Sequence, residues 1–372
     1  MKGLPALALR LTKPMPKVGQ TPADVVHTEN KWRLLRYRPR PEGTAYRTPV
    51  LMVPALINRW YVLDLMPGKS FAEWLVARGH DVFVIDWGEP GPEDRHLTFD
   101  DVADRYLGRA LRIAARSGDR GQAHVLGYCM GGILTAVHTA AHPDRVASLV
   151  QLAAPVRFDD DGLLATWTRT RAFKVGALVS ASGNAPHRLL QGAFHMLKPT
   201  LTLSKLVYLL GGRWDDHALD GFLALETWGN DNVSVPGEFF QRYIEELYRG
   251  NALVRGTFTL SGRPVRLEDI RCPVLNVAFE NDWIVPCRSA AALLDHVSSV
   301  DRTQLQLKGG HVGAVVSSQA SQSLWPQLAG FWAAHDGGGP PADRTSSRPP
   351  ARRAAPPSPV SAGGVGVPLG AR

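Results

Sequence analysis

The sequence has little cysteine and no long hydrophobic run. Only Cys129, Cys272 and Cys287 occur among its 372 residues. So few cysteines, in an odd number, argue against a disulfide framework and for a reducing compartment. The apolar stretches fall well short of the roughly 20 residues that a membrane-spanning helix needs, and the opening MKGLPALALR has too short an apolar core for a secretory signal. These absences predict a cytoplasmic protein without a transmembrane segment.

The middle of the chain also lacks an excess of positive charge, although the net charge is +8. Residues 1–40 hold nine Lys or Arg against two acids, and residues 337–372 hold five Arg against one Asp. Residues 41–336 are therefore mildly acidic, and the basicity belongs to a basic N-terminal segment over 1–40 and to the C-terminal end. Without a recognisable binding module, we expect no interaction with nucleic acid.

The C-terminal residues lack apolar side chains to bury. From residue 337 to 372 the text is mostly Pro, Gly, Ala, Ser and Arg. Such a composition cannot offset the entropy lost on ordering, so it predicts a disordered tail.

Between these ends, short apolar runs alternate with helical patterns. The runs at 49–56, 81–87, 123–129, 148–156, 272–282 and 304–311 are too apolar to be half-exposed strands, and helical patterns cover 70–80, 100–117, 131–143 and 289–299. Buried strands that alternate with helices indicate an α/β fold with a mainly parallel sheet covered on both faces. We place its core at 41–156 and 261–336.

Residues 157–260 break this alternation. They hold no convincing strand and helix repeat, but they contain many aromatic residues. A mostly helical insert that caps the sheet is the simplest account, and most of its aromatic side chains are expected to form the core of the cap itself.

One cysteine lies at a position where folds make side chains reactive. Gly127-Tyr128-Cys129-Met130-Gly131 follows an apolar strand and precedes a helix, which is the pattern of a nucleophile elbow with Cys in place of Ser. The turn is so sharp that side chains at Gly127 and Gly131 would clash, and the start of the helix favours a thiolate at Cys129. The string alone is a weak signal, because a small Cys between glycines can be plain packing.

The chain order of the other candidates strengthens the prediction. An α/β-hydrolase fold places nucleophile, acid and base in that order. Asp282 lies just past the strand PVLNVAFE, and His311 lies past the strand QLQL and two glycines, which makes them the candidate acid and base. Glu280 competes with Asp282 for the acid, whereas His124 and His138 lie within a strand and a helix, where a structural histidine is the default.

An oxyanion hole needs two N–H groups near the carbonyl under attack. We expect the backbone of Met130, directly after Cys129, to supply one. The loop after the first long strand, VPALINRWY, supplies the other, and Ile57 is preferred there over Leu56 or Asn58.

Several motifs together resemble one enzyme family, the polyhydroxyalkanoate synthases. The resemblance covers about residues 20 to 335 and rests on runs in the family's order, namely TPADVVHTENKWRLLRYRP, VPALINRWYVLDL, DVFVIDWGEP, GYCMGG, FLALETWGNDN, ELYRGNALVRGTF, FENDWIVP and GGHVGAVVS. The length is similar to that of the short catalytic subunits of this family. One departure is visible, because Trp283 follows Asp282 where many synthases have histidine.

The resemblance implies an acyltransferase that polymerises (R)-3-hydroxyacyl-CoA, releases CoA and acts at cytoplasmic polyester granules. By the same resemblance Cys129 carries the growing chain as a thioester, His311 activates the thiol, and Asp282 assists His311 or the incoming hydroxyl. It also implies a homodimer, pairing with a second, non-catalytic subunit, and no cofactor or metal. Trp228 matches a tryptophan of the family pattern and is a candidate for the substrate channel, with packing inside the cap as the alternative.

Two other functions stay open at this point. The same elbow occurs in cysteine-dependent hydrolases, such as an intracellular polyester depolymerase or an enzyme like dienelactone hydrolase. A catalytically silent protein of the granule surface is the other, and the intact set of Cys129, Asp282 and His311 argues against it.

Overall fold

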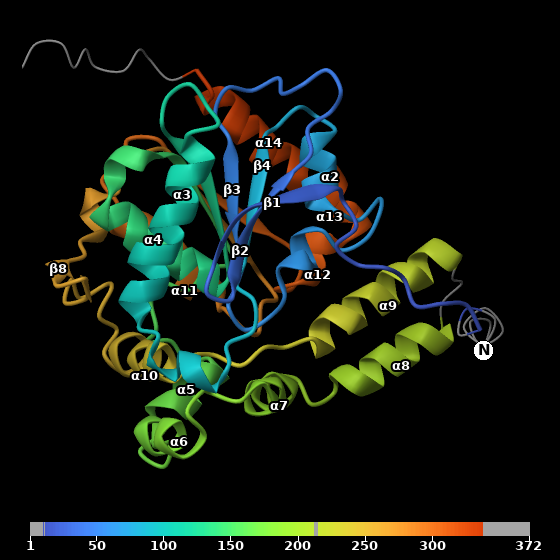
Figure 1. Cartoon of the computed structure of the whole chain (residues 1–372). Helices are drawn as coiled ribbons and strands as arrows, with labels where there is room; N and C mark the ends of the chain where they lie inside the picture. The colour runs from blue at the N-terminus through green and yellow to red at the C-terminus, as the bar shows by residue number, and fades with distance from the viewer. Residues whose placement is uncertain (1–9, 11, 212–214, 338–372) are drawn as a thin grey trace, which may run out of the picture. The chain divides into compact units, whose positions relative to one another are not determined.

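An eight-stranded sheet forms the centre of the protein. The computed structural model describes residues 10, 12–211 and 215–337, so the tail predicted over 337–372 lies outside the described residues except for Gly337. The strands follow the order β1-β2-β4-β3-β5-β6-β9-β10 (Figure 1). Their bounds are Ala23–Glu29, Trp32–Tyr37, Val82–Asp86, Val50–Val53, Ala123–Tyr128, Val146–Leu152, Val274–Phe279 and Arg302–Leu307 in that order.

All pairs from β4 to β10 are parallel, and β2 pairs antiparallel with both β1 and β4. The six predicted strands correspond to β3, β4, β5, β6, β9 and β10, which confirms the mainly parallel sheet. Parallel strands end at a common edge, and this edge receives the loops after β3, β5, β9 and β10.

Helices cover both faces of this sheet, because strand side chains alternate between two apolar clusters. In β3, Leu51 and Val53 join one cluster and Val50 and Met52 join the other. The first face is covered by α3 (Leu107–Ala115) and α4 (Met130–Ala141). The second is covered by α2 (Phe71–Val76), α12 (Gly313–Val316), α13 (Ser318–Gln322) and α14 (Leu324–His335), as Figure 1 shows.

The sheet begins before residue 41, so the predicted start of the core is wrong. Strands β1 and β2 both lie within 1–40, and β2 pairs with β4. Arg33 and Arg36, which were counted as tail charge, form ion pairs with Asp86 (2.6 Å) and Asp81 (2.9 Å) of the β4 region. Charged residues interrupt the apolar pattern of β2, which explains why this strand is hard to recognise in the sequence.

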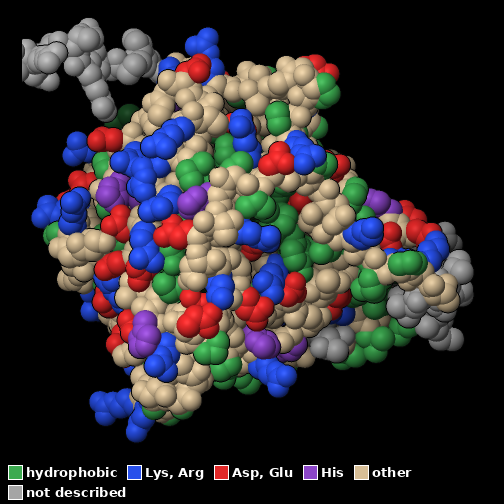
Figure 2. Space-filling model, viewed as in Figure 1, with side chains coloured by type: hydrophobic (Ala, Val, Ile, Leu, Met, Phe, Trp, Pro, Cys, Tyr) green, Lys and Arg blue, Asp and Glu red, His purple; other side chains and the backbone are tan. Residues whose placement is uncertain are grey.

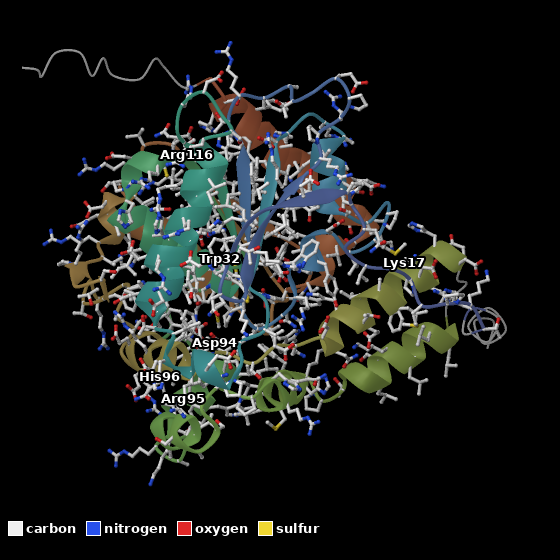
Figure 3. All side chains as sticks on the ribbon, in the orientation of Figure 1. Lys17, Trp32, Asp94, Arg95, His96 and Arg116 are labelled. Carbon is white, nitrogen blue, oxygen red and sulfur yellow. The ribbon has the colours of Figure 1, made fainter. Side chains whose placement is uncertain are left out.

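Trp32 shows that this N-terminal hairpin belongs to the core. It begins β2, is 1% exposed and packs against Tyr106, with 5.6 Å between ring centroids. Figure 3 labels Trp32 near the centre of the view, between the helices of the first face and the strands. Figure 2 shows acidic and basic side chains interspersed over much of the viewed face.

Residues between β6 and β9 are mostly helical. They form α5 (Leu163–Arg169), α6 (Val175–Ser182), α7 (His187–Leu197), α8 (Leu201–Gly211), α9 (Asp216–Asn230), α10 (Gly237–Arg242) and the π-helix η5 (Tyr243–Arg249), followed by the short pair β7 (Thr259–Leu260) and β8 (Arg263–Pro264). Phe239 and Tyr243 of this region belong to the same apolar cluster as α3 and α4. The aromatic residues of the insert therefore extend the main core and do not all form a separate one.

Short helical turns complete the chain. They are η1 (Trp60–Leu63), η2 (Pro92–His96), the π-helix η3 (Asp101–Tyr106), η4 (Pro143–Arg145), η6 (Leu267–Asp269), α11 (Cys287–Ala291) and η7 (Ala292–Asp295). Across the described residues, none of the helices is long and apolar enough to cross a membrane.

Candidate active site

Cys129 lies at a strained turn between β5 and α4. Its φ of 56° and ψ of −125° fall in a region that side chains other than glycine rarely adopt. The turn is fixed on both sides, because the Cys129 N–H donates to the Leu152 carbonyl (3.0 Å) and the Cys129 carbonyl accepts from the Gly132 N–H (2.9 Å). The backbone thus holds the half-buried sulfur at the edge where the parallel strands end.

The two glycines of the elbow are required by close contacts. A Cβ atom at Gly127 would lie 2.2 Å from Thr135 Oγ1, and one at Gly131 would lie 2.0 Å from the Val53 carbonyl oxygen. Real Cβ atoms essentially never approach so closely. Gly127 therefore lets α4 pack on β5, and Gly131 lets α4 pack on the end of β3.

Asp282 and His311 come together as the loop positions predict. His311 Nδ1 lies 2.7 Å from Asp282 Oδ2, and the two side chains are buried. The other carboxylate oxygen, Oδ1, accepts hydrogen bonds from the N–H groups of Ile284 (2.9 Å) and Val285 (2.8 Å). Glu280, the competing acid, is exposed. Backbone N–H groups of the loop after β9 thus hold the Asp282 carboxylate in the orientation in which it binds His311.

His311 connects this carboxylate to Cys129. Because Nδ1 is bound to Asp282, Nε2 is the ring nitrogen left for the hydrogen bond that His311 forms with Cys129. Burial opposes a charge on His311, but the negative charges of Cys129 and Asp282 and the hydrogen bonds to both raise the pKa of His311 from 6.5 to about 10. Tyr128 supports His311 in two ways. The two rings stack with 5.3 Å between their centroids, and the Tyr128 hydroxyl donates to the His311 carbonyl (3.2 Å).

This arrangement can carry out nucleophilic acyl transfer. His311 is placed to exchange a proton with the sulfur of Cys129, and the thiolate is the reactive form of cysteine. His124 and His138, for which a structural role was expected, bind elsewhere. His124 is bonded to Ser148 Oγ (2.8 Å) and His138 to the Ala103 carbonyl (2.8 Å).

The predicted oxyanion donors lie on both sides of Cys129. Met130 is the first residue of α4, so its N–H has no acceptor within the helix. Ile57 lies in the loop after β3 and lines both pockets that Cys129 lines, and no acceptor for the Ile57 N–H occurs among the described residues. Leu56 lines neither of these pockets and Asn58 lines the first, and Ile57 stays the predicted second donor.

Trp228 both lines the pocket and anchors the loop that carries Ile57. The side chain is 8% exposed and borders the same pocket as Cys129 and His311. Its indole Nε1–H donates to the Arg59 carbonyl (2.8 Å). Channel lining and packing, the two alternatives for this residue, are therefore combined in one side chain.

The segment after Trp228 clamps the same loop, and the sequence patterns did not identify it. The Val233 N–H donates to the Ile57 carbonyl (3.0 Å), and Asn58 Nδ2 donates to Asn232 Oδ1 (2.6 Å). Asp231 accepts from Arg59 Nε (3.1 Å) and from the Tyr61 hydroxyl (2.7 Å). The only available signal was the polar string GNDN, which follows Trp228 directly.

Two pockets of different character meet at Cys129. The first has a volume of about 320 Å³ and includes the cationic or titratable side chains of Arg59, His195 and Lys205. The second, of about 430 Å³, is mostly apolar and aromatic, with wall residues such as Trp167, Phe173 and Leu190. Both share Ile57, Cys129, Phe194 and Ile284. A substrate with one polar and one apolar part can thus reach the sulfur from two sides.

Trp283, which replaces the histidine of the family pattern, takes no part in the hydrogen bond between Asp282 and His311. It is 62% exposed, and the ammonium group of Lys198 lies 5.8 Å from its ring centroid.

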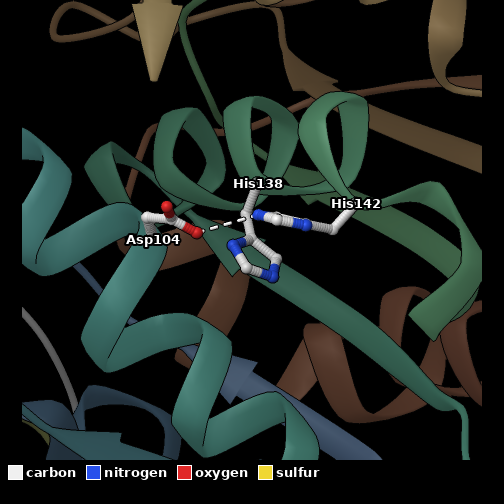
Figure 4. Close-up of side chains that lie close together, drawn as sticks. All are labelled: Asp104, His138 and His142. Atoms are coloured by element: carbon white, nitrogen blue, oxygen red, sulfur yellow. Dashed lines mark hydrogen bonds and ion pairs between the residues drawn. The ribbon is translucent and has the colours of Figure 1, made fainter. Parts of the chain in front are cut away.

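A second cluster, Asp104, His138 and His142, offers potential metal ligands within 4.8 Å of one another (Figure 4). Hydrogen bonds already use these groups, because His142 Nε2 pairs with Asp104 Oδ1 (2.8 Å) and His138 Nδ1 with the Ala103 carbonyl (2.8 Å). Arg112 borders the same site beside Gly108. The buried Nε2 of His138 has no partner among the described residues. A cation beside it would still have to displace the bond between Asp104 and His142 near a guanidinium group, so the cluster is better explained as a contact that ties α4 to η3.

Two family models match the chain. The alpha/beta hydrolase fold matches residues 48–318, and the N-terminus of poly-beta-hydroxybutyrate polymerase (PhaC) matches residues 15–75. The first match confirms the predicted fold. The second includes β1 and β2, in agreement with their place in the sheet.

Curated relatives carry the name poly(3-hydroxyalkanoate) polymerase subunit PhaC. The protein of Allochromatium vinosum is 37% identical over 318 residues, which cover 84% of this chain and 88% of that protein. The protein of Synechocystis sp. is 33% identical, with 84% of each chain covered. The protein of Haloferax mediterranei is 36% identical over 85% of this chain, which spans 64% of that longer protein.

Solved structures agree on the fold. BpoC of Mycobacterium tuberculosis has a TM-score of 0.51 at 17% identity, with 84% of this chain and 99% of that chain covered. A thermophilic esterase from Thermogutta terrifontis has a TM-score of 0.50 at 18% identity, with 84% and 98% covered. At such identities the likeness extends to the fold alone.

Proposed function

Because the chain belongs to the poly(3-hydroxyalkanoate) polymerase (PhaC) family, we propose that it polymerises (R)-3-hydroxyacyl-CoA into polyhydroxyalkanoate and releases CoA. The observation that carries this proposal is the assembly of Cys129, His311 and Asp282 where a pocket of mixed character and an apolar pocket meet. Relatives named as this polymerase match most of the chain.

The first step is the transfer of the acyl group to Cys129. The thiolate attacks the thioester carbonyl carbon of the acyl-CoA, and the bond from that carbon to the CoA sulfur breaks. His311 gives its proton to the departing CoA thiolate, so free CoA leaves as a thiol. The N–H groups of Met130 and Ile57 stabilise the oxyanion between these events. Asp282 keeps His311 in the required tautomer and orientation.

The second step forms the ester bond. The 3-hydroxyl of another hydroxyacyl-CoA attacks the acyl group on Cys129, His311 takes the hydroxyl proton, and the Cys129 sulfur leaves as thiolate. The lengthened chain, still a CoA thioester, returns to Cys129 by the first step with release of CoA. Each cycle consumes one hydroxyacyl-CoA and adds one ester bond.

The chemistry explains why the elbow holds sulfur. Transfer from CoA to Cys129 exchanges one thioester for another at little free-energy change, so the later transfer to a hydroxyl remains downhill. A serine would store the acyl group as an ester and lose that driving force.

The two pockets suggest how the substrate divides between them. Arg59, His195 and Lys205 line the first pocket and are the groups there that could meet the phosphates of CoA. The phosphates would have to compete with the carboxylates that now pair with these cations, Glu89 and Asp231 at Arg59 and Glu226 at Lys205. The apolar second pocket fits the acyl group and keeps water from the thioester. No resident cofactor or metal takes part in this scheme, since CoA is only a leaving group.

The assembly and location of the protein follow from the same family membership. We propose a cytoplasmic protein that acts at the surface of polyester granules, as a homodimer that pairs with a second, non-catalytic subunit. Trp283 in place of histidine is 62% exposed and takes no part in the hydrogen bond between His311 and Asp282, so it is compatible with activity.

The experiment is the release of free CoA from (R)-3-hydroxybutyryl-CoA, with the product analysed for chain length and Cys129→Ala as the control. We expect sustained release that depends on Cys129, with polyester as product. Release that yields only free hydroxy acid would identify a hydrolase instead. No release, even after addition of extract from the native cell to supply a partner subunit, would contradict the proposal.

A further inference from the structure

Two tyrosines five residues apart face the same pocket. Tyr243 and Tyr248 both line the apolar pocket beside Cys129. In an α-helix of 3.6 residues per turn, side chains five apart point about 140° away from each other. The segment from Tyr243 to Arg249 is a π-helix, and the Gly250 N–H bonds to the Glu245 carbonyl five residues earlier (2.9 Å). The wider π-helical turn brings the two rings together, and such turns are frequent at functional sites.

Aromatic packing fixes both rings. Their centroids lie 5.4 Å apart with nearly perpendicular planes, and Phe158 packs edge-on against Tyr248 at 4.9 Å. Tyr243 also stacks on Phe239 at 6.2 Å. Rings held this way can present their hydroxyl groups at a constant position in the pocket.

The hydroxyl groups stand out against their surroundings. Most of the other side chains that line this pocket are apolar, among them Trp167, Leu190 and Val285. The hydroxyl of Thr168 is already bonded to the Leu164 carbonyl (2.7 Å). The two tyrosines therefore give this otherwise apolar pocket hydrogen-bond donors for a polar atom of its ligand.

The electrostatics agree with a donor role. Burial raises the pKa of Tyr243 well above 10, and the charges of Tyr248 and Cys129 add to this effect. Burial also raises the pKa of Tyr248, which the interaction with Tyr243 partly lowers and the charge of Cys129 raises further. Both phenols keep their protons at neutral pH. A phenol that keeps its proton can donate a hydrogen bond to a ligand in the pocket.

We propose that Tyr248, supported by Tyr243, donates a hydrogen bond to the oxygen on C3 of the acyl group and so selects 3-hydroxyacyl groups over plain acyl groups. This inference rests on the proposed function. In a thioester on Cys129 the C3 oxygen lies two carbons beyond the carbonyl carbon, inside the apolar pocket. It is a hydroxyl in the first unit and an ester oxygen in a growing chain, and both accept a hydrogen bond from a phenol.

The test compares acylation by two substrates in the full-length chain. CoA released in the first turnover is measured with (R)-3-hydroxybutyryl-CoA and with butyryl-CoA, which lacks the C3 oxygen. The variants are Tyr248→Phe, Tyr243→Phe and, as control, Tyr106→Phe. Tyr106 is buried to a similar degree as Tyr243 and lies in the π-helix η3, but it lines neither pocket at Cys129.

We expect the preference for the hydroxylated substrate to fall about 10-fold in Tyr248→Phe, the effect of one lost hydrogen bond. Tyr243→Phe should lower it by less, and Tyr106→Phe should leave it unchanged. An equal loss of rate with both substrates in Tyr248→Phe would overturn the inference, because it would indicate a structural role. If Tyr248→Phe does not fold, an unchanged preference in Tyr243→Phe overturns it. Wild-type protein that releases CoA from neither substrate would instead remove the proposed function, and this inference with it.

Discussion

Replacement of Gly131 by alanine should damage catalysis through the loop that carries Ile57. The added Cβ would lie 2.0 Å from the Val53 carbonyl oxygen and 2.7 Å from that of Pro54, whereas ordinary contact begins near 3.4 Å. The end of β3 must therefore move by roughly 1 Å or more, since the interior is close-packed. The Ile57 N–H follows four residues after the end of β3 and moves with it.

The size of the effect follows from the role of this N–H group. Loss of one oxyanion donor costs on the order of 10²–10³ in kcat, and overpacking costs about 1–3 kcal/mol of stability. We therefore expect Gly131→Ala to lower kcat for CoA release at least 100-fold, roughly the cost of a misplacement of about 1 Å. Urea denaturation at the assay temperature measures the loss of stability separately.

The matched control is Gly192→Ala in α7, where an added Cβ meets nothing within 4 Å. This substitution should stabilise the protein by about 0.5–1 kcal/mol and leave kcat unchanged. A Gly131→Ala variant with wild-type kcat would refute the reasoning, because it would show that the loop tolerates the shift or that Ile57 has no part in catalysis.

Three further changes test the remaining parts of the site. Asp282→Asn removes the charge that orients His311 and should lower kcat for CoA release by on the order of 10²–10⁴. A kcat within about threefold of the wild-type value would exclude that role. The pKa of His311 is raised from 6.5 to about 10, so the folded state binds this proton more tightly than the unfolded chain and His311 stabilises the fold fully below pH 6.5. The stability difference between wild type and His311→Gln, from urea denaturation, should thus shrink as pH rises from 6.5 to about 10, and a constant difference would contradict the charged pair. Trp228→Phe leaves the Arg59 carbonyl without its donor and should destabilise the protein by about 1–3 kcal/mol while it lowers kcat; an unchanged kcat would limit Trp228 to packing.

The elements that depend on local pattern were predictable from the sequence. Five strands, β3, β4, β5, β6 and β9, are almost wholly buried because the sheet is covered on both faces, and their apolar runs are visible without a structure. The expectation was wrong for β10, which is the edge strand and leaves most of RTQLQL exposed. The elbow could be read because sterics demand glycine on both sides of Cys129. Asp282 and His311 follow from the chain order of the fold, since both stand directly after a strand.

The parts that depend on long-range pairing were not predictable. In the sequence, Arg33 and Arg36 cannot be told from the other charges of the basic N-terminal segment. Only the pairing of β2 with β4 brings them to Asp86 and Asp81. The bond between Asp231 and Arg59 joins residues far apart in the chain, and no local pattern signals it. The π-helix at Tyr243 is similarly hidden, because its apolar spacing differs from an α-helix by a single residue per turn.

The central claim is that Cys129 carries the acyl chain. The most direct test is the intact mass of the full-length protein after brief mixing with (R)-3-hydroxybutyryl-CoA, followed by peptide mapping. We predict that the wild-type mass increases by one or more hydroxybutyryl units attached to Cys129, and that Cys129→Ala gains none. CoA release without any adduct on Cys129, or an equal adduct in Cys129→Ala, would contradict the account.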